Sequence, residues 1–159
     1  LFRSKAKMSK SLGNCIYLSD EPEEIRTKIM FMFTDPNHIR VQDPGKVEGN
    51  PVFIYLDAFC RPEHFEEFLP DYNNLDELKA HYQRGGLGDV KVKEFLNNVI
   101  QSELEPIRER RKMWEKNLPD VYDILKKGSA AARETAAKTL DDVRHSMRID
   151  YFTDDNLLK

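Results

Sequence analysis

The chain has 159 residues, of which 40% are hydrophobic and 33% charged, a balance typical of a globular domain rather than a disordered or fibrous chain. Its net charge of −3 argues against non-specific coating of a polyanion. No apolar run reaches the roughly 18 residues of a membrane span. The two cysteines, Cys15 and Cys60, match neither a disulfide framework nor a zinc motif, which predicts reduced thiols in the cytoplasm.

The most distinctive segment lies at the N-terminal end, where residues 1–14 carry four basic residues and no acidic one. The string Lys-Met-Ser-Lys-Ser occupies 7–11, and Leu-Gly-Asn follows at 12–14. Ammonium groups, hydroxyls and a glycine that lets backbone N–H groups approach a ligand are the composition of a phosphate site. On composition alone, a basic and serine-rich surface loop without any site stays open as the alternative.

A helix is predicted to begin near Pro22. Asp20 followed three residues later by Glu23 is the pattern of a capping box, and Pro22 suits a first helical turn. The apolar stripe of this helix would consist of Ile25, Ile29, Met32 and Phe33. A loop rich in Pro, Gly, Asp and Asn is expected to follow over 35–51.

The middle of the chain predicts three short helices. They would cover 52–60, 64–68 and 75–83. Asn50 and Pro51 are suited to be the N-cap and the first residue of the first of them, which is apolar nearly all round and should be buried. Gly85 and Gly86 would close the third helix.

The strongest helical periodicity lies over 89–116, and it places Trp114 on the apolar stripe. Pro106 lacks a backbone donor, so a kink or two abutting helices are expected there. A helix over about 120–127 and a last helix should follow, separated by a break at Gly128. No strand pattern of any length appears. The predicted fold class is therefore all-α: a helical bundle preceded by a mobile phosphate-binding loop.

Residues 7–14 resemble the second signature of class I aminoacyl-tRNA synthetases, and several later segments resemble bacterial tryptophanyl-tRNA synthetases. Those segments are 45–59, 85–93, 104–111 and the helix that contains Ala132, Arg133, Leu140, Val143, Arg144 and Met147. The resemblance covers roughly residues 5–148. The signature points to class I, and the later segments point to tryptophan.

This resemblance implies a domain organisation. Residues 1–18 would hold the signature loop and the end of a catalytic domain, 19–149 would form a helical anticodon-binding region, and 150–159 would be a tail. The implied function is the C-terminal part of an ATP-dependent tryptophan–tRNA ligase. Its implied partners are tRNA(Trp), ATP with Mg²⁺, and tryptophan. The intact enzyme would be a cytoplasmic homodimer without a membrane segment.

The resemblance also assigns roles within the signature. Lys10 would contact the ATP phosphates and assist the departure of pyrophosphate, which makes it the catalytic residue. Lys7 would add a second cation, Met8 would lie near the adenine, and Ser9 and Ser11 would supply hydrogen bonds. No metal ligands are expected in this chain.

Four further basic residues are candidates for tRNA contact: Arg108, Arg110, Arg111 and Lys112. Interleaved glutamates leave a solvated helix face open as the alternative. Two other functions also stay open, a tyrosine-specific class I synthetase and a non-catalytic helical interaction module. The chain begins at Leu1 rather than Met and lacks the His-containing first signature of the family, so a fragment that neither activates tryptophan nor binds ATP tightly by itself is expected.

Overall fold

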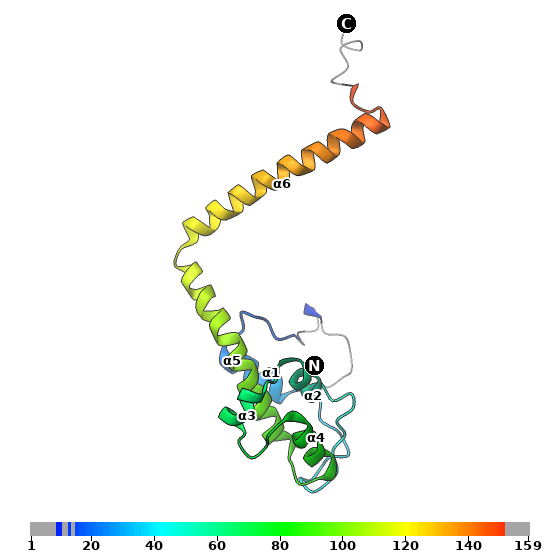
Figure 1. Cartoon of the computed structure of the whole chain (residues 1–159), viewed down its shortest axis with the longest axis vertical. Coiled ribbons are helices and arrows are strands. Elements are labelled where there is room, and N and C mark those ends of the chain that lie inside the picture. Colours follow the sequence, from blue (N-terminus) through cyan, green and yellow to red (C-terminus); the bar gives the residue numbers. More distant parts are fainter. Residues whose placement is uncertain (1–8, 11–12, 14, 152–159) are drawn as a thin grey trace. The chain divides into compact units, whose positions relative to one another are not determined.

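The structure is a computed structural model that describes residues 9, 10, 13 and 15–151. Within those residues the chain forms six helices and no strand, which confirms the all-α fold class (Figure 1). The helices are α1 (Pro22–Met30), α2 (Pro51–Phe59), α3 (Pro62–Phe68), α4 (Leu75–Arg84), α5 (Asp89–Glu115) and α6 (Leu118–Met147). Among the described residues, no helix combines the length and the apolar character needed to cross a membrane.

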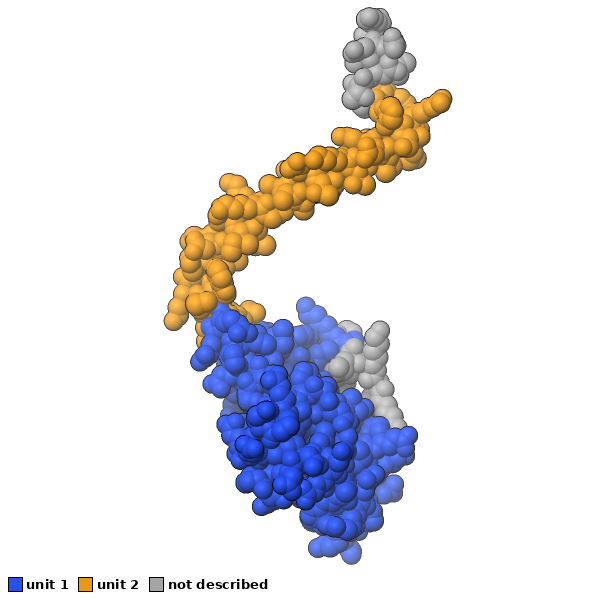
Figure 2. Space-filling model, viewed as in Figure 1, with its two compact units in different colours: residues 1–110 blue, residues 111–159 orange. Residues whose placement is uncertain are grey.

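The chain divides into two compact units, residues 1–110 and 111–159 (Figure 2). The first unit contains α1 to α4 and most of α5, and the second contains the end of α5 and all of α6. The division into 1–18, 19–149 and 150–159 that the resemblance implies stays a prediction.

The core of the first unit is built around the N-terminal part of α5. This helix buries an apolar stripe made of Val92, Phe95, Leu96, Val99 and Ile100. The other helices pack their apolar faces into the same cluster, with Phe65 of α3 at 4.8 Å from Phe95 between ring centroids. Phe53 of α2 meets Tyr82 of α4 at 4.9 Å. Each such fully buried side chain contributes about 1.5–3 kcal/mol to the free energy of unfolding.

Both predicted helix starts are confirmed, since α1 begins at Pro22 and α2 at Pro51, but only one of the two predicted caps is present. Asn50 caps α2, because its side-chain oxygen accepts the backbone N–H of Val52 at 3.0 Å, and Pro51 is the first helical residue. The capping box at Asp20 is wrong. The N-cap of α1 is Glu21, which makes no side-chain cap bond. Asp20 lies one residue too early for that role.

The predicted break at Gly128 is wrong, because α6 runs unbroken from Leu118 to Met147. Glycine costs a helix about 1 kcal/mol relative to alanine, and the good helix formers on both sides outweigh that cost. Pro106 likewise lies inside the single helix α5, so two abutting helices are excluded. Trp114 is 43% exposed, in contrast to the expected core position. The helical periodicity continues past Arg108, whereas burial along α5 ends there.

The loop before α2 lies closely against α4 and α5. The backbone N–H of Gly45 donates to the carbonyl of Tyr82 at 2.9 Å, and a Cβ at Gly45 would lie 2.2 Å from the Tyr82 ring. Asp89, the first residue of α5, accepts a hydrogen bond from the Tyr82 hydroxyl at 2.6 Å. Its second carboxylate oxygen lies 2.9 Å from Nδ1 of His38, a fully buried side chain in the loop. This loop is therefore a fixed part of the fold.

Candidate functional site

The signature segment is described at two of its five residues, Ser9 and Lys10. Lys7, Met8 and Ser11 lie outside the described residues. Lys10 is exposed, and its carbonyl accepts the backbone N–H of Gly13 at 3.2 Å. Gly13 has a φ of 62°, in the left-handed region that glycine adopts without strain, so a glycine at this position allows the turn to form. The arrangement presents a lysine cation to solvent, where an anionic ligand can reach it.

The chain that follows the signature is held against α1. Ile16 packs on the core, and the carboxylate of Asp20 accepts the backbone N–H of Tyr17 at 2.8 Å. Lys28 of α1 donates to the same carboxylate oxygen at 2.5 Å. Sequence reasoning missed this contact because it assigned Asp20 to a capping box. The spacing of eight residues between Asp20 and Lys28 carries no periodic signal of its own.

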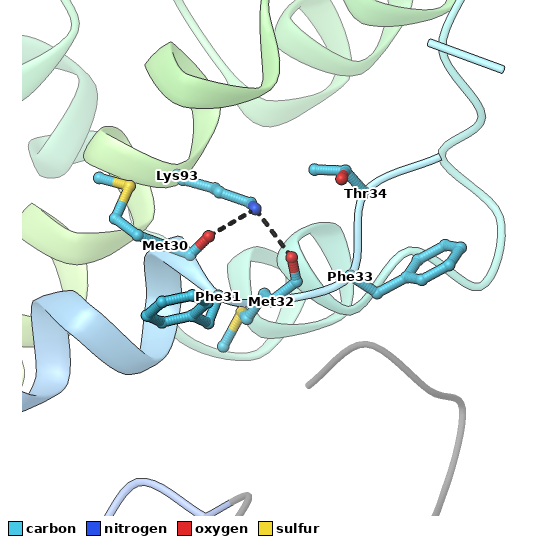
Figure 3. Close-up of a pocket in the computed structure, with 6 residues that line it drawn as sticks. All are labelled: Met30, Phe31, Met32, Phe33, Thr34 and Lys93. Atoms are coloured by element: carbon cyan, nitrogen blue, oxygen red, sulfur yellow. Dashed lines mark hydrogen bonds between the residues drawn. The ribbon is translucent and has the colours of Figure 1, made fainter. Parts of the chain in front are cut away.

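A buried lysine closes the other end of α1. Nζ of Lys93, on α5, donates to the carbonyl oxygens of Met30 at 2.9 Å and of Met32 at 2.8 Å (Figure 3). The last carbonyls of a helix have no partner within the helix, so Lys93 supplies donors where α1 ends. The sequence did hold a signal for this residue, because Lys93 shares the apolar face of α5 with Leu96 and Ile100, at i+3 and i+7.

Lys93 also lines a surface cavity of about 380 Å³. The other lining residues are Met30, Phe31, Met32, Phe33 and Thr34 (Figure 3). Burial lowers the pKa of the Lys93 ammonium, and the negative charge of Asp89 opposes that shift. Two of the three N–H groups of the ammonium point to backbone carbonyls. These contacts assign Lys93 to the support of α1.

The four candidate basic residues lie in the last part of α5 and differ in burial. Arg108 is 7% exposed, and its Nη2 donates to Oε1 of Gln101 at 2.9 Å. Its Nη1 has no hydrogen-bond partner within the part of the chain that the structure describes. Arg110 and Lys112 are exposed, and so is Arg111, which pairs with Glu115 at 2.8 Å. Three of the four candidates are thus available to a partner.

Burial is the main cause of the raised pKa at three other groups, Cys60, Tyr82 and Tyr55. Burial raises the pKa of the Cys60 thiol to about 11. It also raises the pKa of Tyr82, with a further contribution from the hydrogen bond to Asp89. Tyr55 has a raised pKa because of burial and the nearby Cys15. Among the residues described, no group of three or more His, Cys, Asp or Glu side chains is arranged to hold a metal ion.

Comparisons with known proteins agree with the signature. A tryptophan–tRNA ligase of Clostridium longisporum is 61% identical over 148 residues, which are 93% of this chain and 41% of that protein. A tryptophan–tRNA ligase of Streptococcus mutans is 56% identical over 147 residues, again 41% of its length. The chain therefore spans about two fifths of these curated relatives.

A solved structure shares the fold. The tryptophanyl-tRNA synthetase of Campylobacter jejuni superposes with a TM-score of 0.68 at 23% identity, covering 89% of this chain and 42% of that one. A second structure of that protein, with ADP and tryptophan, gives the same TM-score. The family model described as tRNA synthetases class I (W and Y) matches residues 1–105. This match covers most of the chain, which therefore belongs to the class I tRNA synthetases for tryptophan and tyrosine.

Proposed function

We propose that the chain is the C-terminal part of a tryptophan–tRNA ligase. The observation that carries the proposal is the exposed Lys10, within a class I signature and within the residues that the family model matches. The relatives at 61% and 56% identity support tryptophan over tyrosine as the amino acid, because both bear the name tryptophan–tRNA ligase. The chain spans 41% of their length, so we expect it to require the remaining part of the enzyme for activity.

The chemistry of activation accounts for the lysines. The tryptophan carboxylate attacks the α-phosphorus of ATP, the bond to the bridging oxygen breaks, and pyrophosphate leaves with the electron pair. A cation that meets this developing charge lowers the barrier rather than only tightening the binding of ATP. In our proposal Lys10 supplies that cation, Lys7 adds a second one, and Ser9 and Ser11 donate hydrogen bonds. By the same resemblance Met8 would serve the adenine side of the site, and Mg²⁺ would enter with ATP.

The second half of α5 is proposed to face tRNA. Arg110, Arg111 and Lys112 are exposed and basic, as contact with a phosphate backbone requires. The buried Arg108 takes no direct part, since its guanidinium binds Gln101 within the same helix. The partner would be tRNA(Trp), bound by a homodimer in the cytoplasm, with residues 1–18 belonging to the catalytic domain and 19–149 to the helical region.

Tryptophan-dependent pyrophosphate exchange in the full-length protein tests the function. We expect Lys10→Ala to lower the exchange rate by about 10²–10³, the effect of losing one preorganised charge stabiliser. Lys126→Ala, at an exposed position of α6, is the matched control and should leave the rate of pyrophosphate exchange unchanged. Exchange that depends on tyrosine would favour the tyrosine-specific alternative. Absence of exchange with either amino acid would refute the function, and an unchanged kcat for Lys10→Ala would remove Lys10 from the mechanism.

A further inference from the structure

A buried carboxylate holds the chain just after the signature. Asp20 is 5% exposed, and its side chain accepts the backbone N–H of Tyr17 at 2.8 Å. The backbone N–H of Asp20 in turn donates to the carbonyl of Tyr17 at 3.1 Å. These two bonds close residues 17–20 into a tight turn, only seven residues after Lys10 in the sequence.

Lys28 attaches this turn to α1. Its Nζ lies 2.5 Å from the Asp20 carboxylate, 3.1 Å from that of Glu24, and 4.9 Å from the centroid of the Tyr17 ring. Burial lowers the pKa of Lys28, but the hydrogen bonds to Asp20 and Glu24 outweigh burial, so the pKa is raised and the cation persists at neutral pH. The side chains of Lys28 and Asp20 are only 15% and 6% exposed, so solvent screens this pair far less than a surface ion pair.

The helix that carries Lys28 is itself fixed to α5 at both ends. The carbonyl of Pro22, at its start, accepts a hydrogen bond from Nε2 of Gln101 at 2.9 Å. Lys93 binds the carbonyls of Met30 and Met32 where the helix ends (Figure 3). Because α1 is held at two points, a contact to Lys28 fixes the turn at 17–20 relative to the core of the first unit.

We propose that Asp20 and Lys28 are positioning residues for the adenylation step, and that they act through Lys10 by fixing the point where the signature segment joins the helical core. The inference rests on the proposed function, because it requires Lys10 to act on ATP, and it adds two residues outside the signature. A charged group displaced by about 1 Å from its productive position loses on the order of 10² in rate. An attachment that sets this position therefore contributes to catalysis without touching ATP.

The test uses Lys28→Gln and Asp20→Asn in the full-length protein, assayed by tryptophan-dependent pyrophosphate exchange. Each variant should lower kcat/KM for ATP about tenfold and leave KM for tryptophan within about twofold of wild type. Lys28→Arg keeps the cation and should retain activity within about threefold. The double variant should be no worse than the poorer single variant, because both changes break one contact.

Lys79→Gln is the matched control. It removes the ion pair between Lys79 of α4 and Asp57 of α2, another lysine–aspartate contact in the same unit, and should leave both kinetic constants unchanged. Circular dichroism on each sample gives the folded fraction, so that a loss of folded enzyme is separated from a loss of rate.

Three results would overturn the proposal. Folded Lys28→Gln and Asp20→Asn with the kinetics of the control would leave the ligase function intact and remove the pair from it. Activity that falls only in proportion to the folded fraction would assign the pair to stability alone. Absence of exchange in the wild-type enzyme would refute the proposed function together with this inference.

Discussion

Replacing Lys93 by methionine removes the two hydrogen bonds at the end of α1 while nearly preserving side-chain length. Hydrogen bonds from a charged donor contribute about 1.5–3 kcal/mol each, so the gross loss is about 3–6 kcal/mol. The variant no longer buries an ammonium, which returns part of that loss. Water entering the adjoining cavity of about 380 Å³ can bind the two carbonyls. We therefore expect the free energy of unfolding to fall by about 1–3 kcal/mol at pH 7.

The pH dependence of this difference has a definite sign. Burial lowers the pKa of Lys93 below its ordinary value of 10.5, so in the window below 10.5 the unfolded chain binds more protons than the folded one. Stability contributed by Lys93 therefore rises as the pH rises through that window. A neutral amine keeps two N–H groups, enough for the two carbonyls. The methionine variant cannot titrate, so the gap between wild type and variant should widen toward pH 10.5.

Urea unfolding at pH 7 and pH 9.5 measures both effects. Near-UV circular dichroism from the buried Tyr72 and Tyr82 reports on the first unit. Lys91→Met is the matched control on the same helix. Lys91 pairs with the exposed Asp71 and lies 5.8 Å from the centroid of the Tyr72 ring, and losing these two contacts should cost less than about 1 kcal/mol. A Lys93→Met variant as stable as this control would show that Lys93 does not support α1. A gap that narrows with pH would show that burial does not govern its ionisation.

Four other predictions concern separate parts of the chain. Gly85→Ala should lower stability by about 2–4 kcal/mol in urea unfolding, because φ is 89° and the added Cβ would lie 2.3 Å from a backbone oxygen. Gly128→Ala places its methyl group in open space and should stabilise α6 by about 0.5–1 kcal/mol, because alanine has the higher helix propensity. Far-UV circular dichroism should show a higher helical content than in the wild type. Replacing Arg110 and Arg111 by glutamine should weaken tRNA binding and reduce the slope of the log of the tRNA-binding constant against the log of salt concentration by about 1–2. An unaltered slope would show that both arginines are solvated and do not contact tRNA. Cys60, with a pKa of about 11, should react with iodoacetamide at pH 8 on the order of 100-fold more slowly than an ordinary thiol, as followed by mass spectrometry.

Local chemistry made much of the fold predictable. Asn50 followed by Pro51 identified the start of α2, because a cap is decided by neighbouring residues. The apolar stripe of α5 and the glycine that ends α4 were likewise readable. The predictions failed where another effect outweighed a local rule. A glycine ends a helix only when the neighbouring residues have low helix propensity, and the residues around Gly128 in α6 have high propensity.

Less of the functional site could be predicted. The signature named Lys10 directly, whereas the contact between Asp20 and Lys28 depends on how the chain turns back onto α1. An aspartate next to a helix start has several satisfactory partners, and a sequence pattern cannot rank them. Closeness in the sequence grouped Arg108 with its basic neighbours, but whether that residue is buried depends on where the core ends.

The close contact between Gly45 and the ring of Tyr82 matters for protein engineering. By composition, the loop before α2 is the kind of segment into which epitope tags or fluorophore-bearing cysteines are introduced. Any side chain at position 45 would collide with a buried aromatic ring, and the hydrogen bond from Gly45 to the Tyr82 carbonyl would be strained. A label meant to leave the fold of the first unit undisturbed should avoid position 45 and can be placed on α6, in the second unit, where no residue is buried.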